Sequence, residues 1–528
     1  MITRNNFFLT LIVGLSIAIG YLFGKKDSFA TGASEIVHPS IQKLNRLMTY
    51  LAEDYVDAIN TDSLVRVVIE DVVSALDPHS VYIPAVERQA FSESMQGNFE
   101  GIGVQFYMVK DSIAVVRVLE GGPSEKAGLQ YGDRILMANS DSLFLKQLST
   151  DEIINKLKGP SGTAVELKVY RKRTDSLYTF TLERGAVPLP SVPSAYMIND
   201  ETGYIQINRF SQTTYLEFQK ALSGLVDQQM QQLILDLRGN PGGYLLPAKQ
   251  IADDFLSAGK PIVIVEANNG VRERTVASSS GLFEQGSLYV LVDENSASAS
   301  EVIAGAIQDN DRGWIVGRRT FGKGLVQQQM PLGEGDQIRL TTSRYYTPTG
   351  RSIQRPYDST SRKEYYAEVQ KRSNDEERDS EEREPVNDSL SFKTPLGRVV
   401  YGGGGIRPDL YLANSETPEE AWYAFLLRSN WMNQFVFFEL DNHFKKYQFD
   451  NAAILLNEPL PYAEAFLSSF KDYCKANNIS MDIDNEDVVL NSIKAFIALQ
   501  VFDENLYTRI INQKDTFIQQ ALEAIAAE

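Results

Sequence analysis

The sequence predicts a multidomain α/β protein, because three stretches of the chain carry different patterns. Residues 186–412 alternate short apolar segments with amphipathic ones, which is typical of strands and helices around a mostly parallel sheet. Residues 96–185 alternate apolar and polar side chains between glycine turns, which indicates a small β domain. Residues 413–528 carry apolar side chains at helical spacing and many aromatics, so we expect a helical C-terminal domain.

Length and composition narrow the class of protein. The chain has 528 residues, which is too many for one hydrophobic core, so several domains are expected. The net charge of −18 argues against a nucleic-acid partner, which would need a basic surface. A single cysteine, Cys474, excludes disulfides within the chain and cysteine-rich zinc sites. No metal-ligand spacing occurs, and we expect neither a metal nor another cofactor.

The N-terminus predicts export from the cytoplasm. Arg4 precedes an apolar run over residues 7–23, and Lys25 and Lys26 follow it. We interpret residues 1–26 as a signal peptide or a signal anchor, with a buried core helix as the alternative. The run is at the short end of the roughly 17–25 residues that span a bilayer, and cleavage stays open. The body of the protein is expected in the periplasm or elsewhere outside the cytoplasm, anchored to the inner membrane if the segment is retained.

The expected elements follow in chain order. Residues 35–95 predict a helical N-terminal region, because apolar side chains recur at helical spacing until two prolines in LDPHSVYIP interrupt them. The β domain contains one short helix, STDEIINKLKG. The core segments are GYIQINRF, TYLEFQKALSGLVDQ, QLILDL, GYLLPAKQIADDFL, PIVIVEA, SLYVLVD, SEVIAGAIQDN and GWIVG. Residues 358–390 are polar and mixed in charge, which predicts a flexible surface insert within the core.

The stretch VGRRTFGKG, residues 316–324, fits two unrelated kinds of site. Gly317 to Lys323 match the G-x-x-x-x-G-K spacing of a phosphate-binding loop. That loop needs Ser or Thr after its lysine and a helix behind it, but Gly324 follows here and the next residues alternate like strands. We therefore favour the interpretation in which Lys323 is a catalytic amine held in a tight glycine turn.

A nucleophile for that amine is available in DENSASASEVIAGAI. This stretch places Ser296, Ser298 and Ser300 between an apolar strand and an amphipathic helix. A hydroxyl at such a junction lies beside free backbone N–H groups and the positive end of a helix dipole, which stabilise an oxyanion. Ser298 with Glu301 three residues on also fits a capping box, so a purely structural helix cap is the alternative.

The base for a serine nucleophile is not expected to be a histidine. His38 and His79 precede the core and His443 lies in the helical tail, so a Ser-His-Asp triad is disfavoured. A lysine can serve when it is neutral, and burial lowers its pKa from about 10.4. The loop LDLRGNPGG, residues 235–243, follows a buried strand, and its glycines let a backbone N–H approach a substrate closely. An ordinary strand-to-helix turn is the alternative for this loop.

Together these motifs resemble one family, the carboxy-terminal processing peptidases, also called tail-specific proteases. The matching segments occur in family order: LDPHSVYIP, FEGIGVQF, GPSEKAGLQYGDRI, LDLRGNPGG, SASASEVIAGAIQD, GRRTFGKGLVQ and GGGGIRPD. The family consists of Ser-Lys endopeptidases with an inserted PDZ domain. The resemblance implies a twisted-sheet protease core like that of crotonases and the Clp protease, with the PDZ domain at residues 96–185. It also implies an exported serine endopeptidase that cleaves proteins at or near their C-termini.

The resemblance assigns roles to individual residues. Ser298 corresponds to the nucleophile, Lys323 to its general base and Gln327 to the side chain that orients the lysine. The backbone N–H groups of Ala299 and Gly242 correspond to the oxyanion hole, with the next glycine as the alternative to Gly242. An acyl-enzyme on the serine would form and water would release it.

The segment EGIGVQF corresponds to the carboxylate loop of a PDZ domain. Consecutive N–H groups around Ile102 and Gly103 can form a nest for a terminal carboxylate, and the peptide would pair with the strand that begins at Val104. An ordinary hairpin glycine pair is the alternative. The expected partners are protein or peptide substrates with free C-termini, a lipoprotein adaptor and a second copy of the chain in a homodimer.

Two other function classes are weighed against the protease. One is a non-catalytic PDZ adaptor on an inactive protease fold, which the presence of Ser298, Lys323 and Gln327 at the family spacing disfavours. The other is a small-molecule enzyme on a crotonase-like core, which the PDZ-like stretch disfavours. The small, apolar C-terminal segment ALEAIAAE is expected to be frayed and able to enter the peptide groove.

Overall fold

The computed structural model describes residues 39–527 apart from 110–111, 147, 280, 359–360, 373–389, 413–417 and 480–484. The predicted N-terminal signal segment therefore lies outside the described residues. Contacts divide the chain into two compact units, residues 1–72 and 73–528, which are treated separately below. None of the helices in the described ranges is both long enough and apolar enough to cross a lipid bilayer.

The first unit contains the helices predicted before the β domain. Helix α2 covers Pro39–Glu53, and helix α3 covers Thr61–Ser74 and ends just inside the second unit. Both carry apolar side chains at helical spacing, which is the pattern that predicted them.

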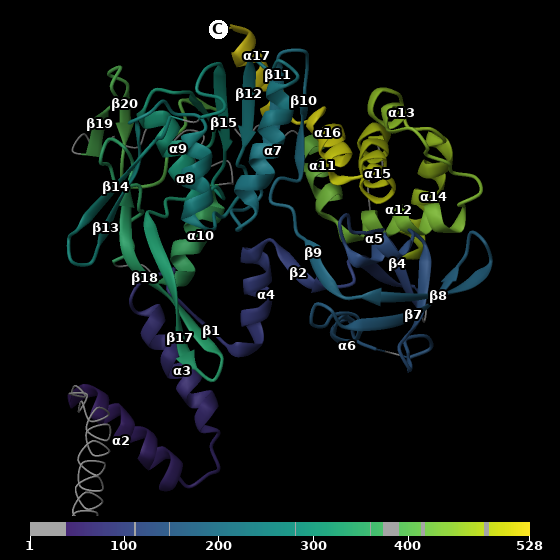
Figure 1. The fold of residues 1–528 in the computed structure, drawn as a ribbon, viewed down its shortest axis with the longest axis horizontal. Helices are drawn as coiled ribbons and strands as arrows, with labels where there is room; N and C mark the ends of the chain where they lie inside the picture. The colour runs from purple at the N-terminus through teal and green to yellow at the C-terminus, as the bar shows by residue number, and fades with distance from the viewer. Residues whose placement is uncertain are drawn as a thin grey trace, which may run out of the picture. The chain divides into compact units, whose positions relative to one another are not determined.

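The core of the second unit is a six-stranded sheet. Its strands lie in the order β10 (Ser194–Met197), β11 (Thr202–Gln206), β12 (Gln232–Asp236), β15 (Ser287–Val292), β16 (Trp314–Gly317) and β21 (Leu410–Tyr411). Figure 1 shows the first four of them side by side. Every neighbouring pair is parallel except β10 and β11. The α/β core predicted from alternating strands and helices is thereby confirmed.

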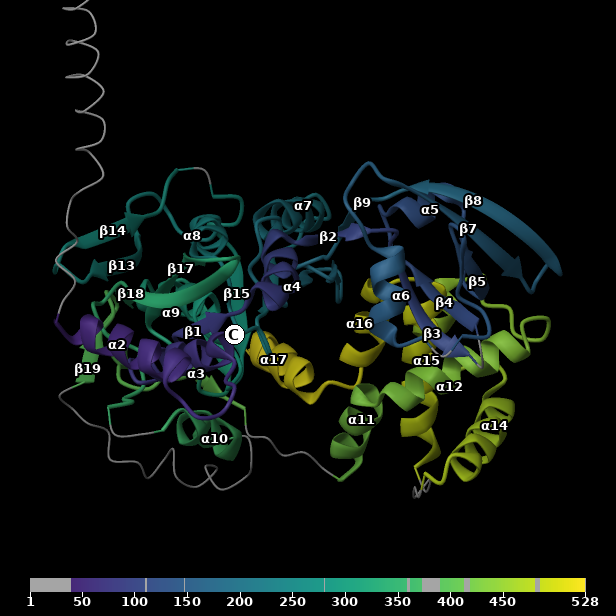
Figure 2. The same cartoon turned by 90° about the horizontal axis from the view of Figure 1, so that it is seen from below.

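Helices cover both faces of this sheet because the strands are apolar on both sides. One face packs against α7 (Thr214–Val226), α8 (Leu245–Asp253) and α9 (Ala299–Asp309). The other packs against α17 (Thr516–Ala527) (Figure 2). Ile518, Ala521 and Ile525 of α17 are buried there. The expectation of a frayed C-terminus is therefore wrong, because an apolar stripe at helical spacing docks the tail on the sheet.

The second unit contains another sheet, which is antiparallel. It contains β1 (Val81–Ile83), β13 (Pro261–Ala267), β14 (Arg272–Val276), β17 (Leu325–Gly333) and β18 (Asp336–Tyr346). All its pairings are antiparallel. The segment PIVIVEA, expected in the mostly parallel sheet, is β13 of this one. A short apolar run cannot distinguish the two settings, since both bury such strands.

The predicted β domain is confirmed as a sheet of short antiparallel strands. It contains β3 (Val104–Val109), β4 (Ser112–Val118), β5 (Asp133–Ala138), β6 (Asp141–Ser142), β7 (Ala164–Arg171) and β8 (Ser176–Glu183). Helices α5 (Pro123–Ala127) and α6 (Thr150–Leu157) pack on it, and Ser149 caps α6 in a capping box. The ribbon of β2 (Asn98–Gly101) and β9 (Gly185–Pro188) joins the domain to the core, and α4 (Ala85–Gln96) precedes it.

The C-terminal domain is helical, as predicted, and lies beside the β domain (Figures 1 and 2). Its helices are α11 (Pro418–Arg428), α12 (Asn430–Asn442), α13 (Ala452–Asn457), α14 (Ala463–Ala476), α15 (Glu486–Val501) and α16 (Glu504–Asn512). They share one apolar core, which includes Phe435, Phe470 and Ile493. The one cysteine, Cys474, is buried in that core as a free thiol.

The first part of the predicted flexible insert is ordered. Residues 362–372 form helix α10 (Arg362–Arg372), and Tyr365 on it is fully buried. The guanidinium carbon of Arg355 lies 3.9 Å from the centre of the Tyr365 ring. The many charged residues of this stretch led us to expect a flexible segment. Two adjacent tyrosines, Tyr365 and Tyr366, nevertheless supply enough apolar surface to dock the helix.

Candidate active site

Ser298 stands at the junction between β15 and α9. It is the N-cap residue of α9, and its backbone has φ 55° and ψ −108°, a conformation that residues with a side chain rarely adopt. Ala299 begins the helix, and among the described residues no hydrogen-bond acceptor faces its N–H. The half-buried serine therefore sits in a strained turn beside an available donor, as expected for a nucleophile at a helix N-terminus.

Glu301 joins the turn of Ser298 to the turn of Lys323. Its Oε2 accepts the N–H of Ser298 at 2.8 Å and the N–H of Lys323 at 2.9 Å. Its Oε1 accepts the Thr320 hydroxyl at 2.6 Å and the N–H of Gly322 at 2.7 Å. Burial raises the pKa of this carboxyl, and the four donors oppose that rise because they stabilise the ionised form. The sequence identified Glu301 only as half of a capping box.

Tyr345 forms a second bridge between the same two turns. Its buried hydroxyl lies 3.0 Å from the carbonyl oxygen of Ser298 and 2.8 Å from that of Lys323. Sequence reasoning missed this residue. Nothing in the sequence of β18 (Asp336–Tyr346) shows which of its tyrosines faces the turn of Ser298.

The Lys323 side chain points along a chain of polar contacts. Its Nζ donates to Oε1 of Gln327 at 2.8 Å, and Nε2 of Gln327 donates to the carbonyl oxygen of His79 at 2.7 Å. Within the described part of the chain, no hydrogen bond joins Lys323 Nζ to the Ser298 hydroxyl. The predicted contact between Lys323 and Gln327 is thus present, whereas the side chains of the lysine and the serine are not hydrogen-bonded to each other in the described part of the chain.

The environment of Lys323 makes its amine easier to deprotonate than the amine of a free lysine. Burial lowers the pKa of Lys323 to about 8, and the charge of Arg339 acts in the same direction. Asp77 and Glu301 act against this shift, because their negative charges favour the ammonium form. About one lysine in ten is then neutral at pH 7, compared with fewer than one in a thousand for a free side chain.

The glycine loop after β12 packs directly against Ser298. A methyl group at Gly242 would lie 2.9 Å from Cβ of Ser298 and 3.0 Å from N of Ala299, and the φ of Gly242 is +97°. The N–H of Gly242 donates to Oδ1 of Asn240 at 2.9 Å, and the carbonyl oxygen of Asn240 accepts from Ala297 at 3.0 Å. The structure therefore brings both predicted oxyanion residues to the serine, with the amide of Gly242 already engaged.

His79 lies at the site although its position in the sequence suggested otherwise. Its ring contacts the hydroxyls of Tyr366, from Nδ1, and Tyr365, from Nε2, each at 3.2 Å. Burial lowers the pKa of His79 to about 3, and the neighbouring charge of Lys323 contributes. The ring is therefore neutral at physiological pH, and its two nitrogens are held by tyrosines rather than by the serine. Its segment, LDPHSVYIP, was among the family motifs, and that is the signal from which its place at the site could have been inferred.

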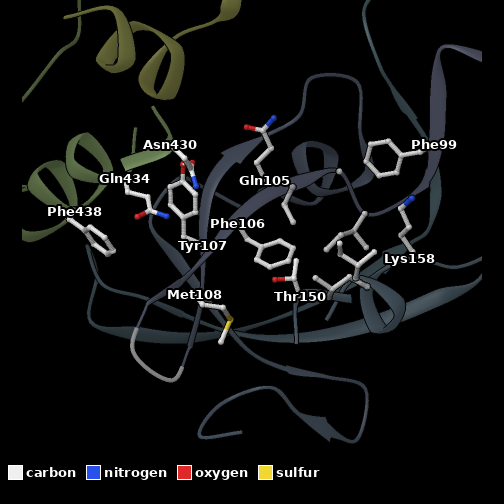
Figure 3. A pocket seen from close by; sticks show the side chains of 15 residues that line it. Phe99, Gln105, Phe106, Tyr107, Met108, Thr150, Lys158, Asn430, Gln434 and Phe438 are labelled. Carbon is white, nitrogen blue, oxygen red and sulfur yellow. The ribbon is translucent and has the colours of Figure 1, made fainter. Parts of the chain in front are cut away.

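The predicted carboxylate loop lies in the β domain, where Ile102, Gly103 and Val104 line a cavity of about 590 Å³ (Figure 3). Within the described residues, the N–H groups of Ile102 and Gly103 have no hydrogen-bond acceptor. The groove runs between α6 and β3, the strand that was predicted to pair with the peptide.

Comparisons with known proteins identify two families in this chain. The profile of peptidase family S41 matches residues 201–358, and that of the PDZ domain matches residues 101–182. The carboxy-terminal processing protease CtpB of Bacillus subtilis (strain 168) is 33% identical over 317 residues, which are 60% of this chain and 65% of that protein. The carboxy-terminal-processing protease of Bartonella bacilliformis is 31% identical over 332 residues, 62% of this chain and 76% of that protein.

Among solved structures, the photosystem II D1 C-terminal processing protease is 28% identical. It aligns with 60% of this chain and 85% of its own, with a TM-score of 0.35. The relatives confirm the resemblance seen in the motifs. This chain belongs to the carboxy-terminal processing proteases of peptidase family S41.

Proposed function

We propose that the protein is an exported serine endopeptidase that cleaves polypeptides at or near their C-termini with a Ser298–Lys323 dyad. One observation carries the proposal: Glu301 binds the turns of Ser298 and Lys323 through a single oxygen, and the lysine is buried enough to lose its proton near pH 8. A serine nucleophile needs a neutral base nearby, and these two features supply the base and its placement.

The reaction begins when neutral Lys323 takes the proton of the Ser298 hydroxyl. The serine oxygen bonds to the peptide carbonyl carbon, and the negative charge that develops on the carbonyl oxygen is stabilised by the N–H of Ala299. The second donor comes from the glycine loop, either from Gly242 after it leaves Asn240 or from Gly243. Lys323 then protonates the leaving amine, and the acyl-enzyme remains on the serine.

Water completes the cycle. Lys323, neutral again, takes a proton from the water that attacks the acyl carbon, and returns it to Ser298 as the peptide acid leaves. Because Lys323 donates to Gln327 in the resting structure, its side chain must turn toward the serine before catalysis. Substrate binding supplies a reason for such a turn, since catalytic hydrogen bonds often tighten only in the enzyme–substrate complex.

The experiment uses the purified full-length chain and an unfolded protein with an apolar C-terminus. One sample of the substrate has a free carboxylate and the other is amidated, and fragments are identified by mass spectrometry. Wild type should cleave, amidation should slow cleavage, and Ser298→Ala and Lys323→Ala should be inactive. Equal cleavage by wild type and both variants would contradict the dyad. Binding of the free tail without cleavage would favour the non-catalytic adaptor instead.

The export part of the proposal rests on the sequence, in which an apolar run at residues 7–23 follows Arg4. Cell fractionation tests it: the chain should be found outside the cytoplasm, and deletion of residues 1–26 should leave it inside. Recovery of the intact chain from the cytoplasm would contradict export. The lipoprotein adaptor and the homodimer stay predictions.

A further inference from the structure

The peptide groove of the PDZ domain has a wall that comes from outside that domain. Asn430, Gln434 and Phe438 of α12 line the same cavity as β3 and α6 (Figure 3). They are spaced four residues apart, so they form one stripe along the helix. The neighbouring positions Met432 and Phe435 are buried in the helical domain's own core.

This wall is fixed to the PDZ domain by its own contacts. The Tyr131 hydroxyl donates to the carbonyl oxygen of Phe437 at 3.2 Å, and the Phe437 ring packs against Tyr107 and Tyr131. Asp441, one turn further along α12, accepts from Arg134 at 2.7 Å and from Lys172. Arg134 and Asp441 are both largely buried, so the stripe is held in place before any ligand arrives.

The two ends of the cavity differ in chemistry. One end holds the free N–H groups of Ile102 and Gly103, with Phe99 and Lys158 nearby, and suits a terminal carboxylate (Figure 3). The other end holds the α12 stripe beside Tyr107, whose hydroxyl donates to Oδ1 of Asn430 at 3.2 Å. That end offers amides, a hydroxyl and an aromatic ring.

Strand geometry sets which substrate residues reach the stripe. A peptide that pairs with β3 advances about 3.4 Å per residue, and Tyr107 is three residues beyond Val104. A carboxylate bound at Ile102 and Gly103 therefore places the third to fifth residues from the C-terminus beside Asn430 and Gln434.

We propose that α12 selects substrates by reading the third to fifth residues from the C-terminus, and that it favours uncharged, hydrogen-bonding side chains there. This inference rests on the proposed function, since the ligand is the substrate's own tail. Among the described residues that line the cavity, Lys158 is the only charged one, and it lies at the carboxylate end. A charged side chain beside the stripe would be partly desolvated without a partner, whereas Ser, Thr, Asn or Gln can bond to the amides.

The test measures binding of fluorescent ten-residue peptides to the full-length Ser298→Ala protein. The peptides end in the same apolar residue and carry Gln, Glu or Lys at the fourth position from the end, each as free acid and as amide. The free acid with Gln should bind best and every amide should bind weakly. In the Gln434→Lys variant, the ratio of the affinity for the Glu peptide to the affinity for the Lys peptide should rise by about fivefold. This is the size of the effect of a favourable exposed charge pair.

The control is Asn442→Lys, which adds the same charge to an exposed position of α12 outside the cavity and should leave the order of preference unchanged. Asn430→Lys, also exposed, repeats the test if Gln434→Lys unfolds. Binding that requires the free carboxylate but ignores the fourth residue in all proteins overturns the α12 inference alone. Binding that does not require the carboxylate in any peptide overturns the tail recognition of the proposed function as well.

Discussion

The backbone N–H groups of Ser298 and Lys323 donate to the same oxygen of Glu301, at 2.8 and 2.9 Å. Two turns that are 25 residues apart in the chain are thereby held by one buried carboxylate, and Tyr345 binds their carbonyl oxygens from the other side. The proposed nucleophile and base are thus positioned by contacts of their backbones, and a bond between their side chains is not needed to hold them together.

Glu301→Gln should lower kcat more than it changes KM. A glutamine keeps the shape but presents an NH2 group to two of the four donors that now face Glu301, which leaves them unpaired and pushes the turns apart. We expect kcat to fall by about tenfold or more. Steady-state kinetics on a peptide substrate checks this.

The matched control for that variant is Glu294→Gln. Glu294 is also a buried carboxylate, but it pairs with Arg318 and does not join the two turns. It should lose stability in a urea titration while kcat stays near the wild-type value. An equal loss of kcat in both variants would show that Glu301 acts through general stability only.

The pH dependence of kcat/KM should report the Lys323 amine. Only the neutral amine is a base, so activity should rise about tenfold per pH unit below pH 8 and level off above it, because burial lowers the pKa of Lys323 to about 8. Arg339→Gln removes a charge that helps to lower this pKa, so the rise should move to higher pH. Arg344→Gln, exposed on the same strand, should leave the profile in place.

Lys323→Met should abolish activity and stabilise the protein at neutral pH. The pKa of Lys323 is lower in the folded protein than in the unfolded chain, which means that the charged lysine destabilises the fold. This destabilisation grows as the pH falls from about 10.5 to 8, and it is complete at pH 7. Its removal should raise the free energy of unfolding by at most about 3 kcal/mol. Urea titrations of wild type and Lys323→Met at pH 7 and pH 10 measure this increase in the free energy of unfolding. The increase should be smaller at pH 10 than at pH 7, and a larger increase at pH 10 would contradict the lowered pKa.

Gly242→Ala should impair the serine through crowding. The added methyl group would press on Ser298 and on the carbonyl oxygen of Ala297, only 2.7 Å away. Gly270→Ala is the control, because Gly270 also has a positive φ, +77°, but open space around it. Gly270→Ala should lose about 1–2 kcal/mol of stability through its positive φ, Gly242→Ala should lose more because of the crowding, and only Gly242→Ala should lose most of its kcat. Normal turnover by Gly242→Ala would argue against this loop as part of the oxyanion site.

Sequence patterns predicted most of the elements, because strands and helices that bury one face leave a period in the chain. The helix of residues 299–309 and the strands after Lys323 were readable in this way, whereas the contact of that lysine with Gln327 was implied only by the resemblance to the family. Sequence periodicity does not show which strands pair with each other. For this reason β13 was expected in the mostly parallel sheet, whereas it lies in the antiparallel one.

Contacts between distant segments were also beyond the sequence. His79 lies far from Lys323 along the chain, and nothing in the sequence indicated that its carbonyl oxygen accepts a hydrogen bond from Gln327. Tyr345 and the α12 stripe carry no motif, since tyrosines in strands and amides on helices are common in proteins of every kind. Their roles follow from where the turns and the two domains meet.

Chemical labelling of Ser298 tests most directly whether Lys323 activates this serine. Wild type and Lys323→Ala are treated with a serine-directed phosphonate across pH 6 to 10, and the modified residue is mapped by mass spectrometry. Wild type should be labelled at Ser298, at a rate that rises with a midpoint near pH 8, and Lys323→Ala should be labelled far more slowly at every pH. Labelling of Lys323→Ala at the wild-type rate, or at another serine, would contradict the proposed dyad.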